Sequence, residues 1–151
     1  MNNDKELAFQ LQQIHRALSR KIRMQLQPLL SQFDLRPIDI ASLNSISRAP
    51  GMTIMELQDT LGLPQSTISS MVKRYQRIGF VNKTVNKFDK RSYCLVLTER
   101  AQEFLKDTLR PESEKHFEIL VTSMTGAEKQ ALSKSLHAIE RALEETEVGQ
   151  L

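Results

Sequence analysis

Short polar side chains gather between Gln65 and Ser70, and cationic residues follow them directly. An α-helix fits the DNA major groove, where short polar residues near its N-terminus reach base edges. Cations farther along such a helix contact phosphates, and the free amides of its first turn add a further contact. This pattern predicts a helix with DNA-reading chemistry. Its expected contact residues are Gln65, Ser66, Thr67, Ser69, Ser70, Lys73, Arg74 and Arg77.

A second group of cations lies between two β-rich segments, residues 80–85 and 92–98. Their composition predicts a β-hairpin with a polar, basic tip. Arg91 is expected to enter the adjacent minor groove, because a narrow groove strengthens the negative potential felt by a guanidinium. Asp89 is expected to hold Arg91 through a salt bridge. The tip residues expected at DNA are Lys87, Asp89, Lys90 and Arg91.

Positive charge is concentrated in the segment from Pro64 to Arg91. This segment holds seven Lys or Arg residues and one Asp, a net charge of +6, whereas the whole chain carries +3. A concentrated field attracts a polyanion more strongly than the same charge spread over the surface. Each cation taken singly is explained as well by a solvated helix face or an ordinary polar turn. Their order along the chain favours nucleic acid.

Start and stop signals predict three helices before the hairpin. Proline in a first turn predicts one over residues 37–48. Thr53 and Glu56 form a capping box that begins a short helix ending at Gly62. The helix with the polar face covers residues 64–79, where a glycine stops it.

Amphipathic helices are expected on both sides of this segment. Apolar residues recur every three or four positions over residues 4–30. Thr98 is expected to cap a helix that meets Pro111, where a kink or break is predicted. Thr125 starts the last helix through a second capping box. The first and the last of these helices each carry an apolar stripe. The stripe of the first helix comprises Leu7, Leu11, Ile14 and Leu18, and that of the last helix comprises Leu132, Leu136, Ile139 and Leu143.

Composition limits the remaining possibilities. A chain of 151 residues with 40% hydrophobic content builds one ordinary domain, or one small domain with helical extensions. No apolar run is long enough to span a membrane. A single cysteine, Cys94, excludes an intrachain disulfide and agrees with a cytoplasmic protein. Neither phosphate-loop nor metalloprotease motifs occur, and His15, His116 and His137 are isolated. We expect no metal, no cofactor and no catalytic residues.

The ordered motifs resemble those of the MarR family of winged helix-turn-helix regulators, over residues 35–105. That family has T-x-x-E-L followed by L-G, then S-T-x-S, G-x-V, D-x-R-S and L-T. Ala101 stands where the family usually has glycine. The matching residues are Thr53, Glu56, Leu57, Leu61, Gly62, Ser66, Thr67, Ser69, Gly79, Val81, Asp89, Arg91, Ser92, Leu97 and Thr98.

The resemblance implies a mainly α fold with a small β-hairpin and a homodimer bound to pseudo-palindromic duplex DNA. In a single MarR-like chain, 1–151, the DNA-binding lobe would cover residues 35–100, and residues 4–30 and 101–147 would form dimerisation helices. The two apolar stripes also favour a homodimer, since a small DNA-binding lobe cannot cover them. The alternative is that both stripes pack within one subunit. A repressor of this kind is often released by a small aromatic effector. Candidate pocket residues, which are equally good core residues, are Ile14, Leu18, Phe33, Ile38, Leu43 and Phe104.

Two other functions compete with a DNA-binding regulator. A winged-helix module could present the same basic face to an acidic protein partner. A small hydrolase or transferase is disfavoured, because three scattered histidines give no catalytic constellation. We therefore expect a regulator and not an enzyme.

Overall fold

The computed structural model describes residues 3–148, so residues 1–2 and 149–151 of the predicted single chain lie outside the described residues. It divides into two compact units, Met1–Ser113 and Glu114–Leu151, which are treated separately. The predicted fold class is confirmed: the chain is mainly helical, with a small antiparallel sheet. None of the described helices is long and apolar enough to cross a membrane.

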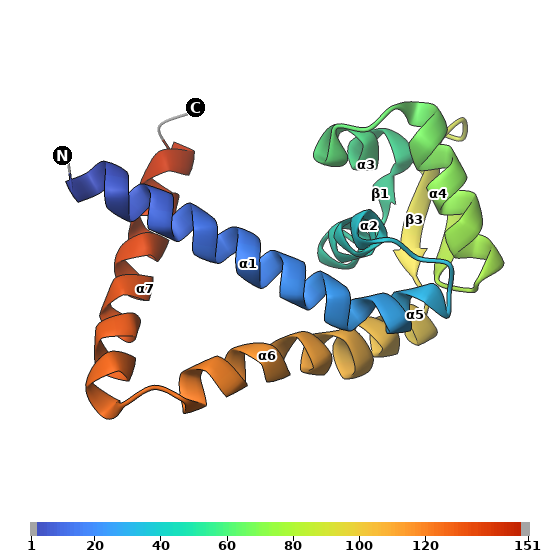
Figure 1. The fold of residues 1–151 in the computed structure, drawn as a ribbon. Coiled ribbons are helices and arrows are strands. Elements are labelled where there is room, and N and C mark those ends of the chain that lie inside the picture. The colour runs from blue at the N-terminus through green and yellow to red at the C-terminus, as the bar shows by residue number, and fades with distance from the viewer. Residues whose placement is uncertain (1–2, 149–151) are drawn as a thin grey trace. The chain divides into compact units, whose positions relative to one another are not determined.

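In the first unit, α2 (Pro37–Arg48), α3 (Ile54–Leu61) and α4 (Gln65–Arg77) gather beside the sheet (Figure 1). The predicted capping box is present: the Thr53 N–H donates to Glu56 Oε2 at 2.6 Å, and the Glu56 N–H donates to Thr53 Oγ1 at 3.2 Å. The first of these bonds is the main cause of a lowered pKa at Glu56. Gly62 closes α3 in the left-handed conformation, which favours glycine.

The hairpin consists of β2 (Val81–Val85) and β3 (Tyr93–Leu97), close to the predicted segments. A third strand, β1 (Met52–Thr53), pairs with the other edge of β3, giving the order β1-β3-β2. Two residues are too short to show an alternating pattern, so the sequence gives no sign of β1. Leu95 and Leu97 are buried, whereas Tyr93 on the same face is 43% exposed because it lies toward the hairpin tip.

Beyond the sheet, the chain remains helical through Pro111. Thr98 caps α5 (Glu99–Glu103) by accepting the Ala101 N–H at 3.2 Å, as predicted. The π-helical segment η1 (Phe104–Leu109) then leads into α6 (Arg110–Thr122). Of the kink or break predicted at Pro111, no break is present: the proline lies in α6, directly after the π-helical segment.

The first helix, α1 (Asn3–Ser31), includes Pro28 and is buried only at its C-terminal end, at Leu30. Near that end, Gln25 Nε2 donates to the Glu112 carbonyl at 2.7 Å. The helix therefore contributes to the core of the first unit through its last turns alone. Its apolar positions nearer the N-terminus, Leu7, Leu11 and Ile14, are more than half exposed.

The core of the first unit contains three aromatic rings from distant parts of the chain. Phe80 is fully buried, and its ring centroid lies 5.0 Å from that of Phe33 and 5.2 Å from that of Phe104. Phe33 and Phe104 make an edge contact at 4.9 Å. These contacts join the end of α1, the start of the hairpin and η1 in one core.

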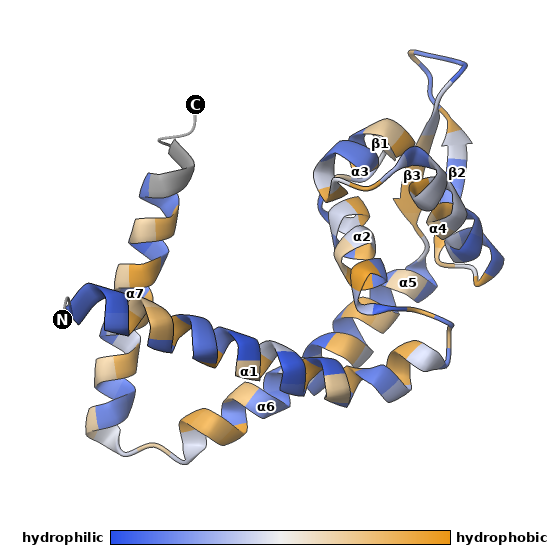
Figure 2. Cartoon of the chain, turned by 45° about the horizontal axis from the view of Figure 1, so that its top comes forward, coloured by the Kyte–Doolittle hydropathy of each residue, from blue (hydrophilic) through white to orange (hydrophobic). Residues whose placement is uncertain are grey.

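In the second unit, α7 (Gly126–Val148) begins at the predicted capping box. The Thr125 N–H donates to Glu128 Oε2 at 2.7 Å, and the Glu128 N–H donates back to Thr125 Oγ1 at 3.3 Å. The apolar stripe of α7 stays accessible, since Leu136 and Leu143 are about half exposed or more. Figure 2 shows alternating polar and apolar stretches along both α1 and α7.

We predict that Phe80→Ala lowers the free energy of unfolding by about 3–5 kcal/mol, because it removes a ring from a closely packed core. Phe88→Ala is the matched control, since Phe88 is completely exposed. It should change stability by less than about 0.5 kcal/mol in urea unfolding. Equal losses for the two variants would contradict the description of this core.

Candidate nucleic-acid interface

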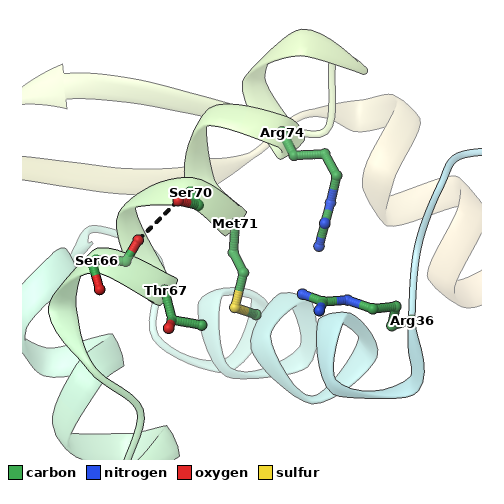
Figure 3. Close-up of a pocket in the computed structure, with 6 residues that line it drawn as sticks. All are labelled: Arg36, Ser66, Thr67, Ser70, Met71 and Arg74. Atoms are coloured by element: carbon green, nitrogen blue, oxygen red, sulfur yellow. Dashed lines mark hydrogen bonds between the residues drawn. The ribbon is translucent and has the colours of Figure 1, made fainter.

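The first half of α4 presents the polar surface that the sequence predicts. Gln65, Ser66 and Ser70 are exposed, whereas Thr67 and Ser69 are half-buried. Ser70 Oγ donates to the Ser66 carbonyl at 2.9 Å, which leaves its lone pairs available as acceptors (Figure 3). Ile68, Met71, Val72 and Tyr75 are buried on the opposite side, as the spacing predicts. The helix is thus held by its apolar side and open on its polar side.

The three cations of α4 lie in different environments. Lys73 and Arg77 are exposed, as predicted, and Arg77 approaches the exposed Asp34 at 3.9 Å. Such a surface pair contributes little and is readily exchanged for a phosphate. Arg74 is different: its side chain is only 17% exposed and pairs with Asp39 Oδ1. Arg74 is therefore not the outward-pointing cation that its place among the expected DNA contacts implies, because it pairs with a buried carboxylate.

Asp39 joins α2 to α4 from a fully buried position. Its Oδ1 accepts from the Arg74 guanidinium and, at 2.7 Å, from the Tyr75 hydroxyl. Its Oδ2 accepts the Arg36 N–H at 2.6 Å and lies 3.5 Å from Arg36 Nε. Burial raises the pKa of the Tyr75 phenol, so the hydroxyl remains a donor at neutral pH. The carboxylate therefore fixes α4 relative to α2.

Sequence reasoning missed Asp39. An acid at the third position of a helix is a common N-terminal stabiliser, and Asp39 does accept the N–H of Arg36, which precedes the helix. Nothing in its spacing indicates that the second oxygen serves residues 35 and 36 positions later in the chain. Only the packing of α2 against α4 brings these groups together.

A pocket of about 370 Å³ lies beside the polar half of α4. Figure 3 shows the guanidinium groups of Arg36 and Arg74 directed toward the same space. Ser66, Thr67 and Ser70 line it together with Met71. Two guanidiniums with neighbouring hydroxyls are suited to an anion such as a phosphate.

The hairpin tip exposes all four predicted residues, Lys87, Asp89, Lys90 and Arg91. The predicted Asp89–Arg91 salt bridge is wrong: Asp89 Oδ1 instead accepts the backbone N–H of Arg91 at 3.0 Å. No ion pair of the described residues involves the Arg91 guanidinium. Asp89 therefore shapes the turn, while the Arg91 side chain remains available to a ligand.

Nearer the base of the hairpin, the Lys83 ammonium lies 4.1 Å from the centroid of the Tyr93 ring. This cation–π contact was not anticipated from the sequence, since it depends on strand register. The contact therefore places a further positive charge, that of Lys83, on the hairpin.

The six candidate effector residues occupy different environments. Leu43 and Phe104 are buried in the core of the first unit, and Phe33 packs against that core. Ile14 and Ile38 are exposed, and Leu18 is half-buried on α1. The structure brings Phe33 and Phe104 into direct contact. An effector role for these residues stays a prediction.

Comparison with known proteins gives the same assignment as the motifs. Residues 33–92 match the family model described as MarR family. A curated relative, the uncharacterized HTH-type transcriptional regulator YcgE of Bacillus subtilis (strain 168), is 27% identical over 113 residues, which cover 75% of this chain and 73% of that protein.

Solved structures share the fold. The transcriptional regulator Tm0710 from Thermotoga maritima superposes with a TM-score of 0.75 at 21% identity, covering 90% of this chain and 95% of that one. An S. aureus MepR mutant bound to an oligodeoxyribonucleotide gives a TM-score of 0.69 at 16% identity, covering 91% and 97%.

A helix-turn-helix followed by a basic β-hairpin defines a winged-helix DNA-binding protein. The family-model match, the curated relatives and the solved structures all support assignment to the MarR family of winged helix-turn-helix transcriptional regulators. The chain is accordingly a DNA-binding regulator and not an enzyme.

We predict that Asp39→Ala lowers the free energy of unfolding by about 3 kcal/mol, because Arg74 and Tyr75 each lose a buried partner. Asp34→Ala is the control: it removes an exposed acid from an exposed pair and should cost less than about 0.5 kcal/mol. A double-mutant cycle between Asp39→Ala and Arg74→Ala should show coupling above about 1 kcal/mol. Additive losses would show that the pair does not stabilise the lobe.

Proposed function

We propose that the protein is a homodimeric repressor that acts in the cytoplasm, binds a pseudo-palindromic duplex and is released by a small aromatic effector. The observation that carries this proposal is that the polar half of α4 and the basic hairpin tip belong to the same unit. The polar half of α4 is exposed and held by the buried Asp39, and the hairpin tip presents exposed cations. The MepR structure bound to an oligodeoxyribonucleotide, which shares this fold, supports it.

Each part of the interface has a distinct role in this proposal. Gln65, Ser66 and Ser70 reach base edges in the major groove, with Thr67 and Ser69 at their margin. Lys73 and Arg77 bind phosphates. Arg74 is already paired with Asp39, so its role in DNA binding differs from that of Lys73 and Arg77. Together with Arg36 it lines a pocket that could hold one phosphate. Arg91, with Lys87 and Lys90, follows the minor groove.

The dimer is proposed from apolar surface that the described units leave exposed. Leu7, Leu11 and Ile14 on α1 are more than half exposed, and so is Leu143 on α7. Exposed apolar residues repeated along a helix are characteristic of interfaces between chains. Residues 4–30 and 101–147 would then be dimerisation helices around lobes formed by residues 35–100. A two-fold dimer requires half-sites about one helical turn apart.

We predict that the protein sediments at twice its chain mass of 17.3 kDa and that Leu11→Glu shifts it toward the monomer. The substituted carboxylate would have to be buried without a partner. Gln13→Glu is the matched control, since residue 13 is exposed and points away from residue 11 on the helix. Sedimentation velocity decides: a monomeric wild-type protein would contradict the proposed dimer.

We predict that the protein shifts a duplex from its own promoter region in preference to unrelated DNA at about 150 mM salt. Arg91→Ala should weaken binding about 10-fold with little loss of stability, because the side chain is exposed and has no acidic partner among the described residues. Lys134→Ala is the control, since Lys134 is exposed on α7 opposite its apolar stripe.

Binding without sequence preference at this salt concentration would contradict the proposed operator recognition. If no duplex is retained while an acidic protein is retained in a salt-dependent way, the interaction-module alternative is correct instead. Unchanged affinity of Arg91→Ala alone would remove only the role assigned to Arg91 in the hairpin.

A further inference from the structure

We propose that Phe88 is an apolar wedge that enters the minor groove beside Arg91, partly unstacks a base step and bends the duplex. This inference rests on the proposed DNA binding. It assigns a ligand to Phe88, whose side chain cannot form hydrogen bonds to phosphates or bases. Figure 2 shows the β2–β3 hairpin extending beyond the helices of its lobe.

The exposure of Phe88 is the first observation. It is 100% exposed, whereas the next most exposed large apolar side chains among the described residues, Met24 and Met55, are at 70%. A fully exposed ring contributes nothing to the packing of its own lobe. Burial of a phenylalanine on binding is favourable in proportion to the apolar area removed from water, so the largest possible gain is available at this position.

Hydrogen bonds within the tip hold the backbone of Phe88 in a defined place. The Phe88 N–H donates to Asn86 Oδ1 at 3.0 Å, and Asn86 Nδ2 donates to Ser92 Oγ at 3.0 Å. The Ser92 N–H in turn donates to the Asp89 carbonyl at 3.0 Å. Side-chain bonds of this type stabilise tight turns, so less backbone entropy is lost when the tip binds.

The charges around Phe88 select a duplex as its ligand. Lys87, Lys90 and Arg91 lie within three residues of it and are exposed. Cations bound to the phosphates on both sides of a minor groove would bring the ring between them to the base edges. Proteins that bind this groove frequently insert phenylalanine, leucine or methionine between base steps and kink the DNA. Phe88 is the one aromatic residue in the sequence of the tip, residues 86–91, and a single ring cannot form the successive stacking platforms that unpaired strands require.

The test compares Phe88→Ala with Lys87→Ala on the bound promoter duplex. Phe88→Ala should weaken binding about 10-fold without changing the salt dependence, because the ring neutralises no phosphate. Lys87→Ala should reduce the slope of log affinity against log salt by about 0.9 for each phosphate that the lysine neutralises in the wild-type complex. Phe88→Leu should retain most of the affinity, since leucine also serves as a wedge.

Two spectroscopic measurements report on the insertion itself. Fluorescence energy transfer between dyes at the duplex ends should show a bend with the wild-type protein and a smaller bend with Phe88→Ala. 2-Aminopurine placed along the site should brighten at one step per half-site with the wild-type protein only.

The outcomes separate this inference from the proposed function. A wild-type protein that binds no duplex contradicts both. If the wild-type protein binds but Phe88→Ala leaves affinity, bend and 2-aminopurine signal unchanged, the wedge is overturned and DNA binding stands. Loss of affinity with an unchanged bend and signal also overturns insertion. If the protein binds anionic vesicles through its basic hairpin tip and Phe88→Ala changes neither the bend nor the 2-aminopurine signal, Phe88 contacts a membrane surface instead.

Discussion

The interaction on which the DNA-binding lobe depends is the buried carboxylate of Asp39. It accepts hydrogen bonds from the α4 residues Arg74 and Tyr75 and from the backbone of Arg36 at the start of α2. A carboxylate without water around it is costly unless its oxygens are bonded, so the position of α4 is set by the need to satisfy this group. The polar half of the helix can therefore remain exposed and still be held in place.

A second set of contacts ties the hairpin to the same helix. Thr98 Oγ1 donates to the Gly79 carbonyl at 2.6 Å, and the Thr98 N–H donates to the Phe80 carbonyl at 3.0 Å. Arg100 Nη1 donates to the Ile78 carbonyl at 2.9 Å, and its guanidinium lies over the rings of Phe33 and Phe80. These contacts therefore join the C-terminal end of α4 to the ends of both hairpin strands. α4 and the hairpin tip, which are proposed to contact the major and the minor groove, are consequently held by the same core.

The sequence predicts what local chemistry decides. The capping boxes at Thr53 and Thr125, the polar face of α4 and the hairpin follow from residue types at short spacing, and the structure contains all of them. It does not predict β1, because a strand of two residues has no periodicity, nor the buried state of Arg74, because its partner lies 35 positions earlier. The expected Asp89–Arg91 salt bridge failed for a related reason: in a tight turn the nearest donor to the carboxylate is a backbone N–H.

In the proposed complex, two rigid lobes present α4 and the hairpin to one duplex. Hydroxyl-radical footprinting of the promoter duplex can detect this arrangement, because backbone protection reports the position of each bound groove. We expect two protected half-sites about one helical turn apart, each with a protected minor-groove segment on its flank. A single protected half-site, or uniform weak protection along the duplex, would contradict it.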